Sequence, residues 1–286
     1  LAACPELLTD MGLRERLLRR LLGRRPSARS PSSKPPRSPV SLSDYAPLHP
    51  ELLSLRPAHL TAATRDALDD GSPEALRALL TEMHPELYAF RPLTDAWCTQ
   101  MREELAHFST WALETGCRYD PPNSMNQYGV VLDEIGFSMM LSTLTAEVVR
   151  PLAAYCFPEV DGGALNRHHG FSVEYRRGGD VDLGFHVDDS EVTLNLCLSE
   201  GFVGGDLFFE GRRCAQHRQT GCSSSDRYRY AHQPGVALLH AGKHRHGAME
   251  LKRGERLNLI LWCQSDRYRQ RDDGRCPPWC QRSMRR

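Results

Sequence analysis

The sequence predicts an α+β protein in which a helical front half is followed by an all-β second half. Before about residue 165, apolar residues recur with the spacing of helices that bury one face. After about Asn166, apolar and polar residues alternate, as they do in half-buried strands. Glycine and proline turns separate these later segments without intervening helices, which is typical of an antiparallel sandwich or barrel.

The first 48 residues are expected to be basic, rich in Pro and Ser, and largely disordered. Residues 14–25 could form a short basic amphipathic helix, whereas residues 26–39 have almost nothing to bury. Residues 1–40 carry nine basic and three acidic side chains, and residues 267–286 carry seven Arg and two Asp, so the stretch 41–266 has a net charge of −11. The basic ends are expected to be solvated tails, and the acidic centre argues against a core that binds nucleic acid.

The chain shows no sign of a membrane span or a secretory signal. No apolar run approaches the roughly 20 residues that a membrane helix needs, and no start segment has the pattern of a cleaved signal. Ten cysteines without a regular framework spacing therefore predict reduced thiols and an intracellular protein. Since residue 1 is Leu1, we expect a fragment or a processed form.

Residues 49–165 are predicted to form a helical region that supports the β part. Ser72 followed by Pro73 has the pattern of a helix start. The next helix is predicted over 95–114, with Gly116 at its end, and another over 142–155. Their apolar faces are expected to be core and consist of Trp97, Met101, Leu105, Phe108 and Ala112 in one helix, and Leu144, Val148, Leu152 and Tyr155 in the other.

Residues 166–266 are predicted to form the β domain. The apolar β-type runs are residues 171–175, 192–198, 207–209, 236–240 and 257–262. Gly pairs at 178–179 and 204–205, and Pro234 with Gly235, mark turns between them. Residues 267–286 then form a basic, Cys-containing tail, which we expect to be flexible.

The chemistry-bearing residues lie in this β half. His186 and Asp188 are two positions apart, so in a strand both side chains point to the same face and can hold one metal ion. A second histidine, His246, follows 60 residues later, and Arg256 comes ten residues after it. Two histidines and one carboxylate around open coordination positions are the arrangement that activates O₂ at ferrous iron. Two open positions suit a 2-oxo acid, and an Arg suits its distal carboxylate.

The runs HVDDSEVTLNLCLSEGFVGGDLFF and PGVALLHAGKHRHGAMELKRGERLNLILW resemble the 2-oxoglutarate/Fe(II)-dependent oxygenases. The branch of the prolyl and lysyl hydroxylases, which is linked to ascorbate, is the most similar. The phrase NQYGVVLDEIGF in the helical half adds to a closer match within this branch. The resemblance implies a double-stranded β-helix, or jelly-roll, and an enzyme that couples oxidative decarboxylation of 2-oxoglutarate to hydroxylation of a substrate. The cofactors it implies are Fe(II), 2-oxoglutarate, O₂ and L-ascorbate.

The resemblance also assigns residues. His186, Asp188 and His246 match the iron ligands, and His246 is favoured over His240 and His244 because Gly247 follows it and Arg256 lies at the family's spacing. Arg256 matches the residue that pairs with the distal carboxylate of 2-oxoglutarate. Tyr175 matches a position that often contacts the co-substrate, or it is an ordinary inward aromatic. Asn195 either lines the barrel or faces outward, and Asp189 is expected to face away from the metal.

Other interpretations stay open at this point. The jelly-roll could act as a non-catalytic scaffold or binding module, or as a metal-dependent lyase or isomerase. A zinc site could be built from Cys214, His217, Cys222 and His232, although their spacing matches no compact pattern. A flexible end is the favoured interpretation of Cys276 and Cys280. The substrate, a protein or a small molecule, is not readable, and loops 199–205 and 212–230 are expected to shape the entrance.

Overall fold

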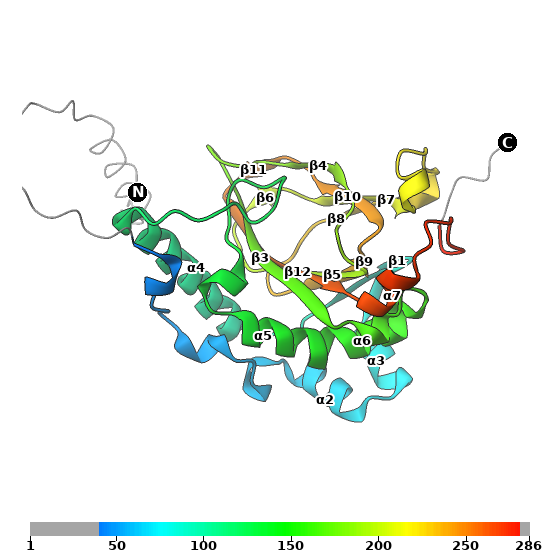
Figure 1. The fold of residues 1–286 in the computed structure, drawn as a ribbon, viewed down its shortest axis with the longest axis horizontal. Helices are drawn as coiled ribbons and strands as arrows, with labels where there is room; N and C mark the ends of the chain where they lie inside the picture. Colours follow the sequence, from blue (N-terminus) through cyan, green and yellow to red (C-terminus); the bar gives the residue numbers. More distant parts are fainter. Residues whose placement is uncertain (1–39, 281–286) are drawn as a thin grey trace, which may run out of the picture. The chain divides into compact units, whose positions relative to one another are not determined.

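The computed structural model of the chain describes residues 40–280 (Figure 1). Six α-helices are present in this part: α2 (Ala62–Asp70), α3 (Pro73–Leu79), α4 (Asp95–Thr115), α5 (Ser138–Thr143), α6 (Arg150–Cys156) and α7 (Asp266–Arg271). A π-helical turn, η5 (Leu144–Val149), joins α5 to α6. Among these helices, none combines the length and the apolar composition needed to span a membrane.

The helix boundaries follow from local capping. The Ser72 side chain accepts a hydrogen bond from the backbone of Ala75 and begins α3, as predicted. Thr94 caps α4 in the same way, and Gly116 ends it in the left-handed conformation, so this predicted helix is confirmed. The predicted helix 142–155 is part of the longer continuous run from α5 to α6. Its Tyr155 is 39% exposed, so the prediction that this ring belongs to the core is wrong.

The strands form two main antiparallel sheets. The larger sheet has the order β1-β2-β9-β5-β12-β3 and the smaller one β4-β10-β7-β8. Their bounds are β1 (Thr81–His84), β2 (Leu87–Phe90), β3 (Arg167–Arg176), β4 (Leu183–His186), β5 (Val192–Cys197), β7 (Leu207–Arg212), β8 (Arg227–Tyr230), β9 (Ala237–Ala241), β10 (His244–Ala248) and β12 (Glu255–Gln264). A small extra pair joins β6 (Val203–Gly204) to β11 (Leu251–Arg253).

The strand order identifies the fold as a jelly-roll. From β3 onward the chain passes back and forth between the two sheets, and only the β7–β8 hairpin stays within the smaller one. The eight strands β3, β4, β5, β7, β8, β9, β10 and β12 make up this double-stranded β-helix. The sheets lie face to face, and the helices cover the outer face of the larger sheet (Figure 1).

One part of the region 49–165 differs from the helical prediction. Residues 81–90 form the β1–β2 hairpin, and β2 pairs with β9, so this hairpin extends the larger sheet at its edge. The register pairs Leu87 with His240 and Phe90 with Ala237. A strand of four residues gives too short a pattern to be recognised among helices, and β2 pairs with a strand that lies about 150 residues away in the sequence.

The larger sheet is buried on both faces. Along β12, Leu259 and Leu261 point into the core shared with the helices, while Asn258, Ile260 and Trp262 line a pocket between the sheets. This alternation follows from the two-residue period of a strand. The pocket therefore lies between the two sheets, and the helical layer packs against the other face of the larger sheet.

The first residues of the described part also differ from the expectation. Residues 40–48 were included in the disordered segment, but Leu42–Asp44 form a 3₁₀ turn and Tyr45 is buried. The Tyr45 hydroxyl lies 3.0 Å from Nδ1 of His107 on α4. The possible helix at 14–25 and the Pro/Ser stretch 26–39 lie outside the described residues.

Candidate metal centre

The strand register brings two histidines together. β10 pairs antiparallel with β4, and His246 lies directly opposite His186. Their ring centroids are 4.2 Å apart. A hydrogen-bonded sheet therefore holds in contact two imidazoles that are 60 residues apart in the sequence.

Asp188 completes a buried group of three. It follows the end of β4, where its backbone N–H donates to the carbonyl of Gly242 at 2.9 Å. Its Oδ1 lies 3.4 Å from Nε2 of His186 and 3.7 Å from Nε2 of His246. One donor atom from each of the three residues lies within 4.8 Å of the others, and all three side chains are buried.

Both histidines present the same nitrogen to the centre. Nδ1 of His186 donates to the carbonyl of Gly184 at 2.8 Å, and Nδ1 of His246 donates to the carbonyl of His244 at 2.9 Å. These bonds place a proton on Nδ1 of each ring and leave Nε2 facing Asp188. Burial lowers the pKa of His246 to about 3, so this ring is neutral at pH 7.

The Asp188 carboxylate is held in place by Thr193 of β5. The Thr193 hydroxyl donates to Oδ2 of Asp188 at 2.6 Å and leaves Oδ1 directed toward the histidines. Burial would raise the pKa of Asp188, but the imidazoles of His246, His186 and His240 hold it well below its ordinary value. The group is therefore ionised and acceptor-only, as a metal ligand requires.

The two other nearby histidines take different places. Nε2 of His240 on β9 lies 4.0 Å from Oδ2 of Asp188, the oxygen that Thr193 already occupies. His244 is on the same strand as His246, and its ring packs edge-on against Phe209 at 5.1 Å. Neither belongs to the group of converging donors.

The donors open onto a pocket lined by both sheets. Its empty volume, open solvent at the mouth included, is about 450 Å³. Alternate residues of each strand reach it, with Phe171, Val173, Tyr175, Asn195, Arg256, Asn258, Ile260 and Trp262 from the larger sheet and Leu183, Leu207 and Ala248 from the smaller one. Asn195 therefore lines the barrel, which decides between the two alternatives for this residue.

Arg256 is the cation of this pocket and is 1% exposed. Its Nη1 donates to the carbonyl of Gly205, in the turn that the Gly pair forms, and its Cζ lies 4.3 Å from the ring centre of Tyr175. Within residues 40–280, Arg256 forms no ion pair with a carboxylate, and its Nε has no hydrogen-bond partner. A buried guanidinium in this state is costly unless an anionic ligand enters, so the pocket fits a carboxylate.

Tyr175 lies opposite Arg256 in the β3–β12 register and also faces the pocket. Its hydroxyl accepts a hydrogen bond of 3.4 Å from the side chain of Asn126. Asn123 and Met125 line the pocket from the same loop, before β3, whereas none of the lining residues comes from 199–205 or 212–230. Since Arg256 of this pocket donates to the carbonyl of Gly205, the expectation that those two loops shape the entrance stays a prediction.

Asn258 and His232 were not predicted from the sequence as parts of this site. Asn258 donates to Oδ1 of Asn195 at 2.6 Å and lies 3.1 Å from Nδ1 of His232. Thr193 was also missed, although its place in the alternating run of β5 was a usable signal. Asp189, as expected, turns away from the centre, and its carboxylate pairs with Arg269 at 3.0 Å.

The donor set fits ferrous iron. Two neutral imidazole nitrogens and one carboxylate oxygen, with open positions toward a pocket, are characteristic of non-haem Fe(II) oxygenases. The unpaired Nε of Arg256 and its guanidinium, aimed into the same pocket, fit the distal carboxylate of a keto diacid.

Comparison with known proteins gives a consistent answer. The family model described as "OGFOD2-like domain" matches residues 42–162. The chain is 44% identical over 229 residues to the "2-oxoglutarate and iron-dependent oxygenase domain-containing protein CP2" of Arabidopsis thaliana, covering 80% of this chain and 58% of that protein. It is 34% identical over 240 residues to "2-oxoglutarate and iron-dependent oxygenase domain-containing protein 2" of Danio rerio, covering 82% of this chain and 67% of that protein.

The human protein of the same name is 33% identical over 253 residues, with 85% of this chain and 69% of that protein covered. Among solved structures, a prolyl 4-hydroxylase of Phytophthora capsici gives a TM-score of 0.48 at 15% identity, over 72% of this chain and 67% of that one. The chain spans 58% of the length of its two Arabidopsis thaliana relatives. By its similarity to these relatives, the chain belongs to the family of 2-oxoglutarate and iron-dependent oxygenase domain-containing proteins.

Proposed function

We propose that the chain is an Fe(II)- and 2-oxoglutarate-dependent dioxygenase, which couples the oxidative decarboxylation of 2-oxoglutarate to the hydroxylation of a protein or small-molecule substrate. The observation that carries the proposal is the convergence of His186, Asp188 and His246 at one end of a pocket that also contains the buried guanidinium of Arg256. A non-catalytic scaffold does not explain why a buried cation without a carboxylate partner lies beside three buried metal donors.

The chain's own residues would bind and orient the reactants. Nε2 of His186, Nε2 of His246 and Oδ1 of Asp188 would hold the iron, which with O₂ supplies the oxidation of an unactivated C–H bond. The Nδ1–H bonds of both histidines and the Thr193 hydroxyl would keep the three donors oriented while the reactants change. We include L-ascorbate in the proposal as the reductant that keeps the iron ferrous.

Arg256 would select the co-substrate. Its planar guanidinium can donate two parallel hydrogen bonds to the distal carboxylate of 2-oxoglutarate. The Tyr175 ring, 4.3 Å from Cζ of Arg256, supports the cation from one side. The apolar side chains of Phe171, Leu207 and Ile260 line the same pocket and would exclude water from the reacting groups.

The test is turnover without a substrate, measured as succinate formed from 2-oxoglutarate with Fe(II) and ascorbate. We expect wild-type protein to form succinate and Asp188→Ala to lose this activity, because one of three metal ligands is gone. Asp189→Ala is the matched control, since this neighbouring carboxylate is exposed and pairs with Arg269. Equal succinate from wild type and Asp188→Ala would reject catalysis at this site and favour the non-catalytic interpretation.

A second experiment tests the role of Arg256. We expect Arg256→Lys to raise the KM for 2-oxoglutarate by about 10- to 100-fold, because a hydrogen bond to a charged group contributes about 1.5–3 kcal/mol and Lys cannot form the paired bonds. The same assay with varied 2-oxoglutarate measures this change. Arg253→Lys, at an exposed position on β11, should leave KM unchanged. An unchanged KM in Arg256→Lys would contradict the assignment.

A further inference from the structure

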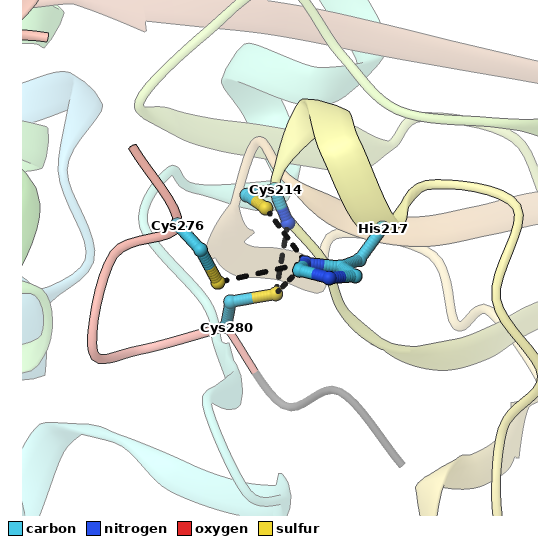
Figure 2. A group of neighbouring side chains, drawn as sticks. All are labelled: Cys214, His217, Cys276 and Cys280. Atoms are coloured by element: carbon cyan, nitrogen blue, oxygen red, sulfur yellow. Dashed lines mark hydrogen bonds between the residues drawn. The ribbon is translucent and has the colours of Figure 1, made fainter. Parts of the chain in front are cut away.

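A second group of metal-binding side chains lies away from the His–Asp–His centre. Cys214 precedes the short 3₁₀ turn Ala215–His217 that follows β7, and His217 is the last residue of this turn. Cys276 and Cys280 belong to the segment after α7. Figure 2 shows the side chains of all four pointing toward one another, and one donor atom from each lies within 4.8 Å of all the others.

The distances agree with tetrahedral coordination. Nδ1 of His217 lies 3.2 Å from Sγ of Cys214, 3.5 Å from Sγ of Cys276 and 3.6 Å from Sγ of Cys280. Around a tetrahedral zinc ion, bond lengths of about 2.3 Å to sulfur and about 2.0–2.1 Å to nitrogen separate these atoms by about 3.6 Å. The three separations thus lie close to those that a shared zinc ion would impose.

Hydrogen bonding or disulfide formation explains the group less well. One imidazole nitrogen takes part in one good hydrogen bond, yet three sulfur atoms surround Nδ1 of His217 at nearly equal distances. A disulfide would consume two of the thiols and leave the third and the imidazole without a role. All three cysteines are free.

The surroundings suit thiolates. The backbone N–H of Cys214 donates to Sγ of Cys280 at 3.3 Å. A sulfur that accepts such bonds is stabilised as the anion, which is the form that binds metal.

Other contacts hold the carboxyl-terminal segment against the same turn. Gln216 donates to the carbonyl of Gly274 at 2.6 Å. The Trp279 ring lies under the guanidinium of Arg212, 4.3 Å from its Cζ, and the indole N–H donates to the Tyr268 hydroxyl at 3.2 Å. The four donors thus belong to a packed structure rather than to a loose end.

We propose that Cys214, His217, Cys276 and Cys280 bind one Zn²⁺ ion in a closed structural site. Three thiolates and one imidazole fill the tetrahedron, so no position remains open for a reactant. The site joins the segment 272–280 to the end of β7. Because β7 pairs with β10, where Arg212 lies opposite His244, the zinc stabilises the sheet that carries His246.

The zinc site considered from the sequence, whose spacing matched no compact pattern, shares two residues with this group. Cys214 and His217 belong to the group, but Cys222 and His232 do not. Cys222 accepts a hydrogen bond from Arg227 at 3.3 Å, and His232 lies beside Asn258. Cys276 and Cys280, which were expected in a flexible end, take their places.

The test measures metal in the full-length chain. In the Asp188→Ala background, which weakens the iron site but keeps every thiol, we expect one zinc per chain. Replacement by Co²⁺ should produce the thiolate-to-cobalt charge-transfer band and the strong visible bands of a tetrahedral sulfur site. The His–Asp–His centre has no sulfur ligand and cannot produce the charge-transfer band. No zinc and no such band in this protein would overturn the proposal without any change at the cysteines.

Variants then assign the ligands. Cys280→Ser and Cys276→Ser should each lose the zinc or weaken its binding at least tenfold, and should lower Tm. Cys222→Ser is the matched control, a partly buried cysteine of the same loop, and should keep both the zinc and the cobalt spectrum. Zinc retained in both Cys276→Ser and Cys280→Ser would contradict the assignment. So would a wild-type mass 2 Da below that of the reduced chain, which would show a disulfide.

Discussion

At the scale of residues, His186 and His246 use their two nitrogens in the same way. Each Nδ1–H is bonded to a backbone carbonyl, and each Nε2 faces Asp188. The acceptors, Gly184 and His244, lie two residues before each histidine on the same strand, so no residue from another strand is needed to orient the rings. A strand therefore supplies both the proposed iron ligand and the group that orients it.

The Thr193 hydroxyl is the corresponding support for the carboxylate, and it gives a prediction at this scale. Thr193→Val keeps the shape of the side chain but removes the bond to Oδ2 of Asp188. We expect the Fe(II) concentration for half-maximal succinate formation to rise about 10- to 100-fold, as when other bonds that orient metal ligands are removed.

Thr193→Ser is the control for this substitution, because it keeps the hydroxyl and should need nearly the same Fe(II) concentration as wild type. If Thr193→Val and Thr193→Ser gave the same half-saturation, the bond would have no role in holding Asp188.

At the scale of elements, the contact between β4 and β10 depends on a glycine. A Cβ added at Gly247 would lie 2.4 Å from Cζ of Phe208 and 2.6 Å from the carbonyl oxygen of Leu183. This position is adjacent to His246, where the β4–β10 register shifts. The glycine after the second histidine is thus required by the close approach of the neighbouring strands.

We therefore expect Gly247→Ala to destabilise the protein by about 1–3 kcal/mol, as overpacking of a filled site does. Thermal unfolding should show this as a lower Tm. Gly184→Ala is the matched control on β4, because a Cβ there meets no atom within 4 Å. A Tm for Gly247→Ala equal to that of Gly184→Ala would mean that the strands can separate without cost.

At the scale of the whole molecule, the helical layer and the two sheets bury polar groups together with the apolar core. His232 is 6% exposed and lies between Asn258 and the ring of Tyr230. Burial lowers its pKa to about 3, and Arg256 contributes in the same direction. Below about pH 6.5, the imidazole of His232 therefore takes up a proton in the unfolded chain but stays neutral in the folded protein.

Lowering the pH therefore reduces the stability of the folded protein through His232. His232 contributes its full share to stability above about pH 6.5, and this share is lost as the pH falls toward 3. Between pH 7.5 and 5.5, wild type should lose about 1 kcal/mol more of its unfolding free energy than His232→Gln, which has no proton to gain. Urea unfolding of both proteins at the two pH values measures this difference. Parallel losses would show that His232 does not titrate in this way.

Local patterns in the sequence were enough to predict much of the fold and part of the candidate site. Ser72 and Gly116 mark helix ends through bonds and dihedral angles within one turn, and the strand alternation reports which side chains share a face. The spacing of His186 and Asp188 predicted that both side chains share one face, and the two do lie together, although Asp188 comes just after the end of β4. The resemblance of the later motifs to a family added His246 and Arg256.

The type of each long element and the donor atoms that it carries are local properties, and these could be predicted from the amino-acid sequence. The tertiary structure alone decided which distant segments meet. It paired β2 with β9, brought Asn126 to the pocket, and joined Cys276 and Cys280 to Cys214 and His217. These contacts depend on strand order and on the packing of helices against the larger sheet, and no period of two or 3.6 residues encodes them.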